Sequence, residues 1–144
     1  MSTEDNKQIV LRWKQEIWDK QNYSAVDEFF APNYVGHITG WPGAAQDREA
    51  LKQGFADFFA SFDMRDTREF LIAEGDWVAI HDTYCVKHAR DFRGIPPTGK
   101  ETTVTGVDIY HIVDGKIVEQ WFEGDVTGAL QRLGCLPSPE DGRA

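Results

Sequence analysis

The hydrophobic pattern changes from a helical to a strand-like period at about residue 63, and this change limits the possible fold most. Before it, apolar residues recur every three or four positions, as on one face of a helix. After it, apolar and polar residues alternate in runs separated by short turns. Helices followed by antiparallel strands are typical of an α+β domain whose helices lie on one face of a curved sheet.

The helical part predicts two longer helices and a short one between them. Ile9, Trp13 and Ile17 recur every four residues and predict a helix over residues 3–20. Asp47 is expected to cap a later helix. The short helix is predicted over residues 25–30, with Ser24 and Asp27 as a capping box and Pro32 as its stop.

The strand-like part predicts hairpins. Residues 74–76 and the pair Asp114-Gly115 are turn signals, and the latter suits a type I′ turn. The Pro-containing stretch 94–99 is expected to be a rigid loop, and residues 126–133 a last short helix. The predicted strands are residues 33–39, 68–73, 77–88, 102–113 and 116–123.

Length, charge and hydropathy limit the class of protein. The 144 residues suit a single domain, expected over 1–136, with a flexible C-terminal tail over 137–144. A net charge of −9 argues against nucleic acid as a partner. No apolar run reaches the roughly 20 residues that span a bilayer, so no membrane partner is expected. Residues 1–7 are polar and acidic, unlike a signal peptide, which favours the cytoplasm.

The strand at 102–113 carries apolar residues on both faces. An antiparallel strand with one solvated face should alternate more cleanly. We therefore expect the second face to be covered by another subunit, in a homodimer formed through the sheet. The two sets are Val104, Tyr110 and Ile112 on one face, and Val107, Ile109 and Val113 on the other.

Asp108 is the first candidate for chemistry, because it stands between Val107 and Ile109. A carboxylate in apolar surroundings has a raised pKa and can serve as a general base or acid near neutrality. The alternative is a buried Asp that hydroxyls or backbone amides satisfy. Asp125 could lie at a cavity mouth, or could simply cap the last helix.

Histidines offer a second set of candidates. His37 lies on the first predicted strand, and His88 precedes the Pro-containing loop. Either could shuttle a proton or donate a hydrogen bond to a substrate oxygen, but a polar residue at a strand end is the simpler account of each. By strand parity, His81 and His111 face the opposite side, where a dimer interface is expected.

Metal, nucleotide and nucleophilic sites are not indicated. The four His show no HxH, HxxxH or HExxH spacing, and Cys85 and Cys135 form no CxxC pair. No GxSxG, Walker or dinucleotide motif is present. Aromatic residues make up 12% of the chain, including five Trp, more than a core of this size usually needs. A flat, apolar small molecule is therefore an expected ligand.

Several segments together resemble the SnoaL-like polyketide cyclase (ester cyclase) group of the nuclear transport factor 2-like superfamily. The resemblance implies a cone-shaped α+β barrel, cystatin-like, with a bent antiparallel sheet wrapped on N-terminal helices around an apolar pocket. The segments that carry it are 31–37 (APNYVGH), 74–79 (EGDWVA), His88 with 94–100 (GIPPTGK), 106–110 (GVDIY), 114–119 (DGKIVE), Trp121, Asp125 and 130–134 (LQRLG).

The resemblance also implies a chemistry, namely intramolecular aldol ring closure of a polyketide ester without metal or organic cofactor. The family's acid/base Asp falls at Phe122, its partner His at Asp108, and a glycine at Arg90. Asp108 would then take the carboxylate role. Its expected partners are Asp125, His37 and His88, and the expected substrate-binding residues are Tyr34, Trp41, Tyr110, Trp121 and Phe122.

Three functions remain open from the sequence. The first is a cofactor-independent cyclase or isomerase acting on a small hydrophobic carbonyl or polyketide-like substrate. The second is a non-catalytic ligand-binding domain, and the third is a dimeric assembly module. A cavity of several hundred Å3 would favour a ligand over an assembly module.

Overall fold

The computed structural model describes residues 2–39 and 47–137. Trp41, with the predicted turn around it, and residues 138–144 of the predicted tail lie outside this part. The described elements are α1 (Thr3–Lys14), the π-helical turn η1 (Gln15–Asp19), the 3-10 turn η2 (Tyr23–Ala25), α2 (Val26–Phe29), β1 (Phe30–Ile38), α3 (Arg48–Ser61), β2 (Phe62–Glu74), β3 (Trp77–His88), β4 (Glu101–Val113), β5 (Lys116–Gly124) and α4 (Val126–Arg132).

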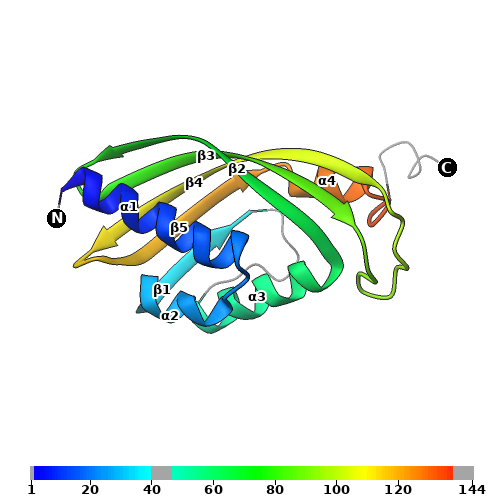
Figure 1. Cartoon of the computed structure of the whole chain (residues 1–144), viewed down its shortest axis with the longest axis horizontal. Helices are drawn as coiled ribbons and strands as arrows, with labels where there is room; N and C mark the ends of the chain where they lie inside the picture. The colour runs from blue at the N-terminus through cyan, green and yellow to red at the C-terminus, as the bar shows by residue number, and fades with distance from the viewer. Residues whose placement is uncertain (1, 40–46, 138–144) are drawn as a thin grey trace.

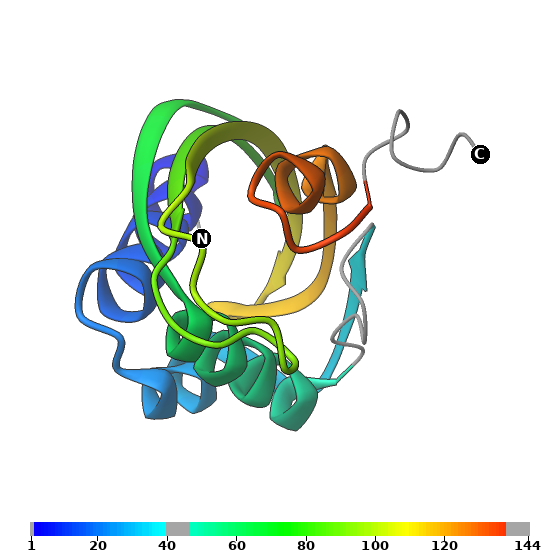
Figure 2. The ribbon, with the colours of Figure 1, turned by 90° about the vertical axis from the view of Figure 1, so that its right-hand side faces the viewer.

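The strands form one sheet in the order β1-β5-β4-β3-β2. Neighbours are antiparallel except β1 and β5, which are parallel. The sheet curls strongly, α1, α2 and α3 lie along the side that it leaves open, and α4 lies at one end of the curl (Figure 1; Figure 2). This arrangement confirms the predicted α+β class, with a bent sheet on N-terminal helices. The curl is not closed, because β1 and β2 are both edge strands.

Strand alternation divides the sheet into a concave and a convex face. Along β3 and β4 the even-numbered residues point to the concave face, where most of them are buried, whereas the odd-numbered ones point outward. Val78, Ile80 and Ile112 pack on this inner side in one core cluster with Trp13 of α1. The rings of Trp13 and Tyr110 meet edge to face, 5.9 Å apart.

The first helix covers nearly all of its predicted span but changes its winding within it. Ser2 and Asp5 cap its start reciprocally, and the α-helix ends at Lys14. A π-helical turn follows, with Ile17 fully buried within it. π-turns insert a residue into the helical repeat and are frequent at functional sites. Here the helix places both Lys14 and Trp18 against the concave side of the sheet.

The predicted hairpins are confirmed, including their tight turns. Trp77–His88 has the predicted bounds, and Asp114 and Gly115 both have positive φ, as a type I′ turn requires. The second strand, however, begins at Phe62 and not at Arg68. The charged run from residue 63 to 69 hid its first half, and a bulge between Arg68 and Phe70 interrupts the alternation.

The short helix also differs from its prediction. Ser24 makes no cap, because its hydroxyl donates to the Asn22 side chain at 2.8 Å. The α-helical part is only Val26–Phe29, and Pro32 lies inside the edge strand β1, where a missing N–H is tolerated. None of the described helices is long and apolar enough to cross a membrane.

Candidate functional site

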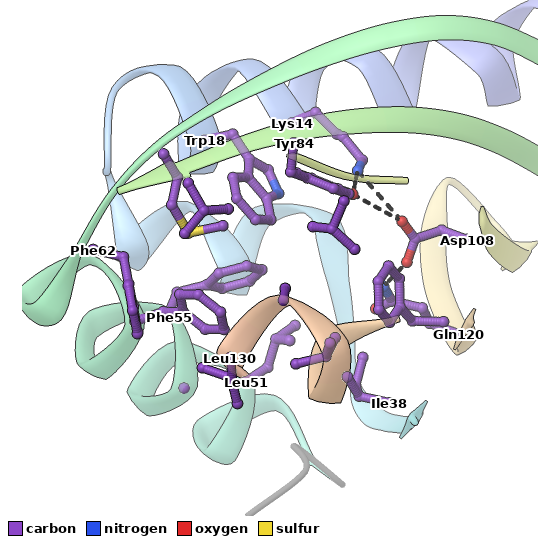
Figure 3. Close-up of a pocket in the computed structure, with 18 of the residues that line it drawn as sticks. Lys14, Trp18, Ile38, Leu51, Phe55, Phe62, Tyr84, Asp108, Gln120 and Leu130 are labelled. Carbon is purple, nitrogen blue, oxygen red and sulfur yellow. Dashed lines mark hydrogen bonds and ion pairs between the residues drawn. The ribbon is translucent and has the colours of Figure 1, made fainter. Parts of the chain in front are cut away.

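A cavity of about 130 Å3 lies between the concave face of the sheet and the helices. Most of its wall is apolar. It is built by Trp18 of η1, Phe55 of α3, Phe62 of β2, Leu130 of α4, and other apolar residues of these and the remaining strands and helices (Figure 3). This volume is below that of typical ligand pockets, about 300–1,000 Å3, and near that of a cavity that holds a single benzene ring.

One end of the cavity is polar. Lys14, Tyr84, Asp108 and Gln120 reach it from α1, β3, β4 and β5, and they bond to one another (Figure 3). Gln120 Nε2 donates to Asp108 Oδ1 at 2.8 Å, while Lys14 Nζ lies 3.4 Å from Asp108 Oδ2. Lys14 Nζ also donates to the Tyr84 hydroxyl at 2.9 Å. A single buried carboxyl group therefore faces the apolar space with both oxygens held.

Gln120 is itself fixed from behind. The Tyr34 hydroxyl donates to Gln120 Oε1 at 2.7 Å, so the amide must present its NH2 group to Asp108. Tyr34 and Gln120 are both buried. This chain of bonds fixes the direction in which Asp108 points.

Lys14 has two further carboxyl neighbours behind the cavity. Its ammonium group is hydrogen-bonded to Asp82 Oδ2 and lies 3.8 Å from Asp66 Oδ2. The Tyr84 hydroxyl donates to the same Asp82 oxygen at 3.0 Å. The side chains of Asp66 and Asp82 have no exposed surface, and that of Lys14 has 1%. The Lys14 ammonium group is thus the cation that these carboxyl groups and Asp108 surround.

Burial and charge shift the protonation of this group. Burial raises the pKa of Asp108, and the Lys14 charge and the Gln120 hydrogen bond oppose that rise only in part. Burial alone would lower the pKa of Lys14, but Asp108, Asp66 and Asp82 outweigh it and raise the pKa. Burial, with the nearby carboxylates, raises the pKa of Tyr84 well above its ordinary value. Asp108 is therefore a stronger base than an exposed Asp, and Tyr84 keeps its proton.

The ring of Phe122 forms part of the wall beside this polar end. It lies over two paired glycines, Gly106 of β4 and Gly124 of β5. A Cβ atom on Gly106 would come within 2.5 Å of Phe122 Cε2, and one on Gly124 within 2.7 Å of Phe122 Cζ. The two glycines leave the space that the ring occupies.

The structure brings two of the sequence candidates into the wall, Asp108 and Phe122. Tyr34 and Tyr110 are buried behind it and are not among the lining residues. Trp121 points to the convex face, because it alternates with Phe122, and there it stacks with His37, ring centroids 5.2 Å apart.

The three expected partners of Asp108 lie elsewhere. Asp125 caps α4, where its carboxylate accepts from the Gly128 N–H at 3.0 Å and its side chain is 70% exposed. His37 is exposed on β1, with Nε2 2.7 Å from Glu119 Oε2. His88 is buried at the end of β3, where its Nδ1 accepts from the Thr98 N–H at 3.2 Å. None of the three lines the cavity.

Sequence reasoning missed most of the polar network. Lys14, Tyr84 and Gln120 line the cavity with Asp108, and Asp66 and Asp82 lie behind Lys14. Two signals could have found part of it. Lys14 is four residues after Val10 and so lies on the apolar side of its helix. Asp82 shares strand parity with apolar Val78, Ile80, Tyr84 and Val86.

Among the described residues, no group of three or more His, Cys, Asp or Glu is placed to hold a metal ion. The expectation of a cofactor-free site stays a prediction. The side chains of the polar end are the groups available for the chemistry.

Several solved structures share this fold along almost the whole chain. A candidate polyketide cyclase from Acidithiobacillus ferrooxidans is 29% identical over 93% of this chain and 98% of its own, with a TM-score of 0.78. IdmH from Streptomyces antibioticus, also a candidate polyketide cyclase, is 28% identical over 90% and 98%, with a TM-score of 0.76. AclR from Streptomyces galilaeus, a candidate hydroxylase, is 25% identical over 95% and 85%, with a TM-score of 0.79.

A comparison with curated proteins gave no match. The family model of the SnoaL-like polyketide cyclases, in contrast, matches residues 8–133, a span that holds every side chain of the polar network and every residue that lines the cavity. With the fold and that match in agreement, the chain belongs to the SnoaL-like polyketide cyclase family.

Proposed function

We propose that the chain is a cofactor-independent enzyme in which Asp108 removes a proton next to a carbonyl group of a small apolar substrate. The observation that carries the proposal is the position of Asp108. Its carboxyl group ends an otherwise apolar cavity, with both oxygens held by Gln120 and Lys14. Family membership supports a cyclase-type reaction.

The proposed step needs no other reagent. The Asp108 carboxylate takes the α-proton, the electrons of the C–H bond form an enolate, and donors at the polar end stabilise its oxygen. Besides Gln120, which holds the other carboxyl oxygen, the donors close to Asp108 are the Lys14 ammonium and the Tyr84 hydroxyl, at 3.4 and 3.5 Å from Oδ2. In a ring closure, the enolate carbon attacks a second carbonyl, and the new alkoxide takes back the proton from Asp108. Atoms and charge balance over the cycle.

The cavity volume limits the substrate. About 130 Å3 is close to the size of a cavity that holds one benzene ring, so the substrate must be compact, and a side chain on the ring requires the wall to move. The wall contributes aromatic faces from Trp18, Phe55 and Phe122, which suit a flat ligand. We therefore propose a compact aromatic or cyclic carbonyl compound.

The test uses 1-phenylpropan-2-one, a compact aryl ketone, in D2O. Binding is measured by quenching of the tryptophan fluorescence, since Trp13 and Trp18 line the cavity. Proton removal is measured as deuterium uptake at the benzylic carbon by 1H NMR. We expect binding and catalysed exchange, with exchange lost in Asp108→Asn and binding retained.

Asp125→Asn is the matched control, because Asn also caps helices and Asp125 lies outside the cavity. Exchange that survives in Asp108→Asn, or is lost only in Asp125→Asn, overturns the assignment. Binding without exchange in the unaltered protein favours the non-catalytic ligand-binding domain. Absence of binding favours the assembly module.

We further propose that the convex face of the sheet binds a second copy of the chain. Large apolar side chains are exposed there, and together they form what we call the convex patch: Phe70, Ile72, Trp77, Val107, Ile109 and Val113. Phe70 and Ile72 are 56% and 63% exposed. Contiguous apolar surface of this kind marks an interaction site.

A further inference from the structure

The group behind the cavity has more carboxyl groups than cations. Asp66, Asp82 and Asp108 surround the single ammonium of Lys14. Arg68 adds one more charge, with its Nε 3.2 Å from Asp66 Oδ2, but its guanidinium also binds both oxygens of Asp19, at 3.0 and 3.1 Å. Like charges buried this close cannot all ionise, since the charged forms have lost their water.

Three of the carboxyl oxygens lack a hydrogen-bond donor. Asp66 Oδ1, Asp66 Oδ2 and Asp82 Oδ1 are buried, and no described N–H or O–H group donates to them. Asp66 and Asp82 both lie against the Lys14 ammonium, and a hydrogen bond between their side chains is one of the causes that raise the pKa of Asp66. Two carboxyl groups bond in this way only when one of them carries a proton, which then supplies the missing donor.

The partners of each group indicate which one carries it. Asp82 Oδ2 accepts from both Lys14 and Tyr84, as an ionised carboxylate does. Asp66 accepts a hydrogen bond from neither. Its Oδ2 lies 3.8 Å from Lys14 Nζ and 3.2 Å from Arg68 Nε, without a hydrogen bond to either nitrogen. Asp66 is therefore the acid of the pair and Asp82 the anion.

We propose that Asp66 and Asp82 share one proton, and that this acid pair leaves Lys14 to hold Asp108 as an ionised base. The proposal rests on the function proposed above, in which Asp108 is the base. Asp66 and Asp82 act as positioning residues, because they reach the cavity only through Lys14 and Tyr84. The proton on Asp66 removes a third negative charge that would otherwise face Asp108 and favour its protonated form.

The electrostatics agree with this assignment. Burial raises the pKa of Asp66 to about 7, helped by the hydrogen bond and charge of Asp82 and opposed by Lys14 and Arg68. The charged and titratable groups that face the pair are Lys14 from α1, Arg68 from β2, Tyr84 from β3 and Asp108 from β4.

The test is a titration of the Asp side-chain carboxyl carbons by 13C NMR between pH 3 and 9. We expect one resonance with its midpoint near pH 7, absent from Asp66→Asn, whose amide can donate to Asp82 in place of the carboxyl proton. We also expect the Asp108 resonance to show a second inflection at that pH, lost in Asp66→Asn. In Asp82→Asn, Asp66 loses the neighbouring charge, and its midpoint should fall by about two pH units.

Asp63→Asn is the matched control, because Asp63 lies on the same strand with its side chain 63% exposed, and it should leave the midpoint near pH 7 unchanged. An Asp66 midpoint below about pH 5 in the unaltered protein overturns the proposal. The proposal is also overturned if the titration curve of the Asp108 resonance is the same in the unaltered protein and in Asp66→Asn. The titration needs no substrate, so its result holds even if the exchange assay detects no activity. In the same way, the exchange assay can be interpreted whatever the titration shows.

Discussion

The ammonium nitrogen of Lys14 lies 3.4 Å from Asp108 Oδ2, although 94 residues separate the two in the chain. This contact joins the first helix to the centre of the sheet, and it also places a charge at the end of an apolar cavity. Each of these buried charges is stabilised by the other, because burial removes the water that would otherwise solvate them. One contact thus serves both the docking of α1 and the ionisation of the proposed base.

Lys14→Met should destabilise the protein by about 3–5 kcal/mol, because it leaves Asp82 and Asp108 without their cation. Urea unfolding followed by tryptophan fluorescence measures the effect. Lys20→Met is the control, since Lys20 is 56% exposed and pairs with the nearby Glu16, and it should change stability by less than about 1 kcal/mol. Equal effects from the two variants would contradict a buried role for Lys14.

The stability of the protein should carry a pH dependence that comes from Asp66. Its pKa is about 7 in the fold, against an ordinary value of 3.8, so the folded chain binds this proton more tightly than the unfolded chain. Its contribution is therefore complete below about pH 4 and is lost as the pH rises through 7. The urea midpoint of the unaltered protein, relative to Asp66→Asn, should fall between pH 4 and 7.5. A constant difference would count against the shifted pKa.

The sequence predicted regular elements well where one physical pattern acted alone. Trp77–His88 alternates cleanly and has the bounds that were predicted, and Asp47 accepts from the Ala50 N–H as a helix cap. The prediction of strand bounds failed where charged residues point into the interior of the protein. Asp66 and Arg68 face inward on β2, and their charges made that half of the strand look like a loop.

The candidate site was harder to predict because its partners are far apart in sequence. Asp108 stood out from its apolar neighbours, but nothing local indicates that Lys14 or Gln120 would meet it. Histidines and a helix-capping Asp drew attention as chemically able residues. The structure shows that His37 faces outward, and it places Asp125 at the start of α4, as the capping alternative expected.

We expect the convex patch to form a dimer interface, and a single charged substitution in it should dissociate the dimer. Phe70→Glu places a carboxylate among exposed apolar side chains, and it should convert the protein from dimer to monomer at micromolar concentration. Sedimentation velocity measures the mass. Ala60→Glu adds the same charge on the exposed side of α3 and should leave the dimer intact. A monomeric unaltered protein would overturn the proposed interface.

Gly106→Ala should reshape the cavity through Phe122. The added methyl group would lie 2.5 Å from Phe122 Cε2 and 3.4 Å from Tyr84 Cε2, so the Phe122 ring must move. We expect a loss of about 1–3 kcal/mol in stability, typical of overpacking, and weaker binding of 1-phenylpropan-2-one. Gly54→Ala in α3 is the control for stability alone, because its methyl group meets nothing within 4 Å but Gly54 itself lines the cavity.

A double-mutant cycle separates this cause from a general effect of the substitution on β4. In Phe122→Leu the smaller side chain leaves room beside Gly106, so adding Gly106→Ala should cost less than it does with the native ring. The coupling between the two positions should be about 1 kcal/mol or more in unfolding free energy, because the two groups are in direct contact. Additive effects would show that the methyl group acts on the strand backbone, and the glycine would then have no role in shaping the cavity.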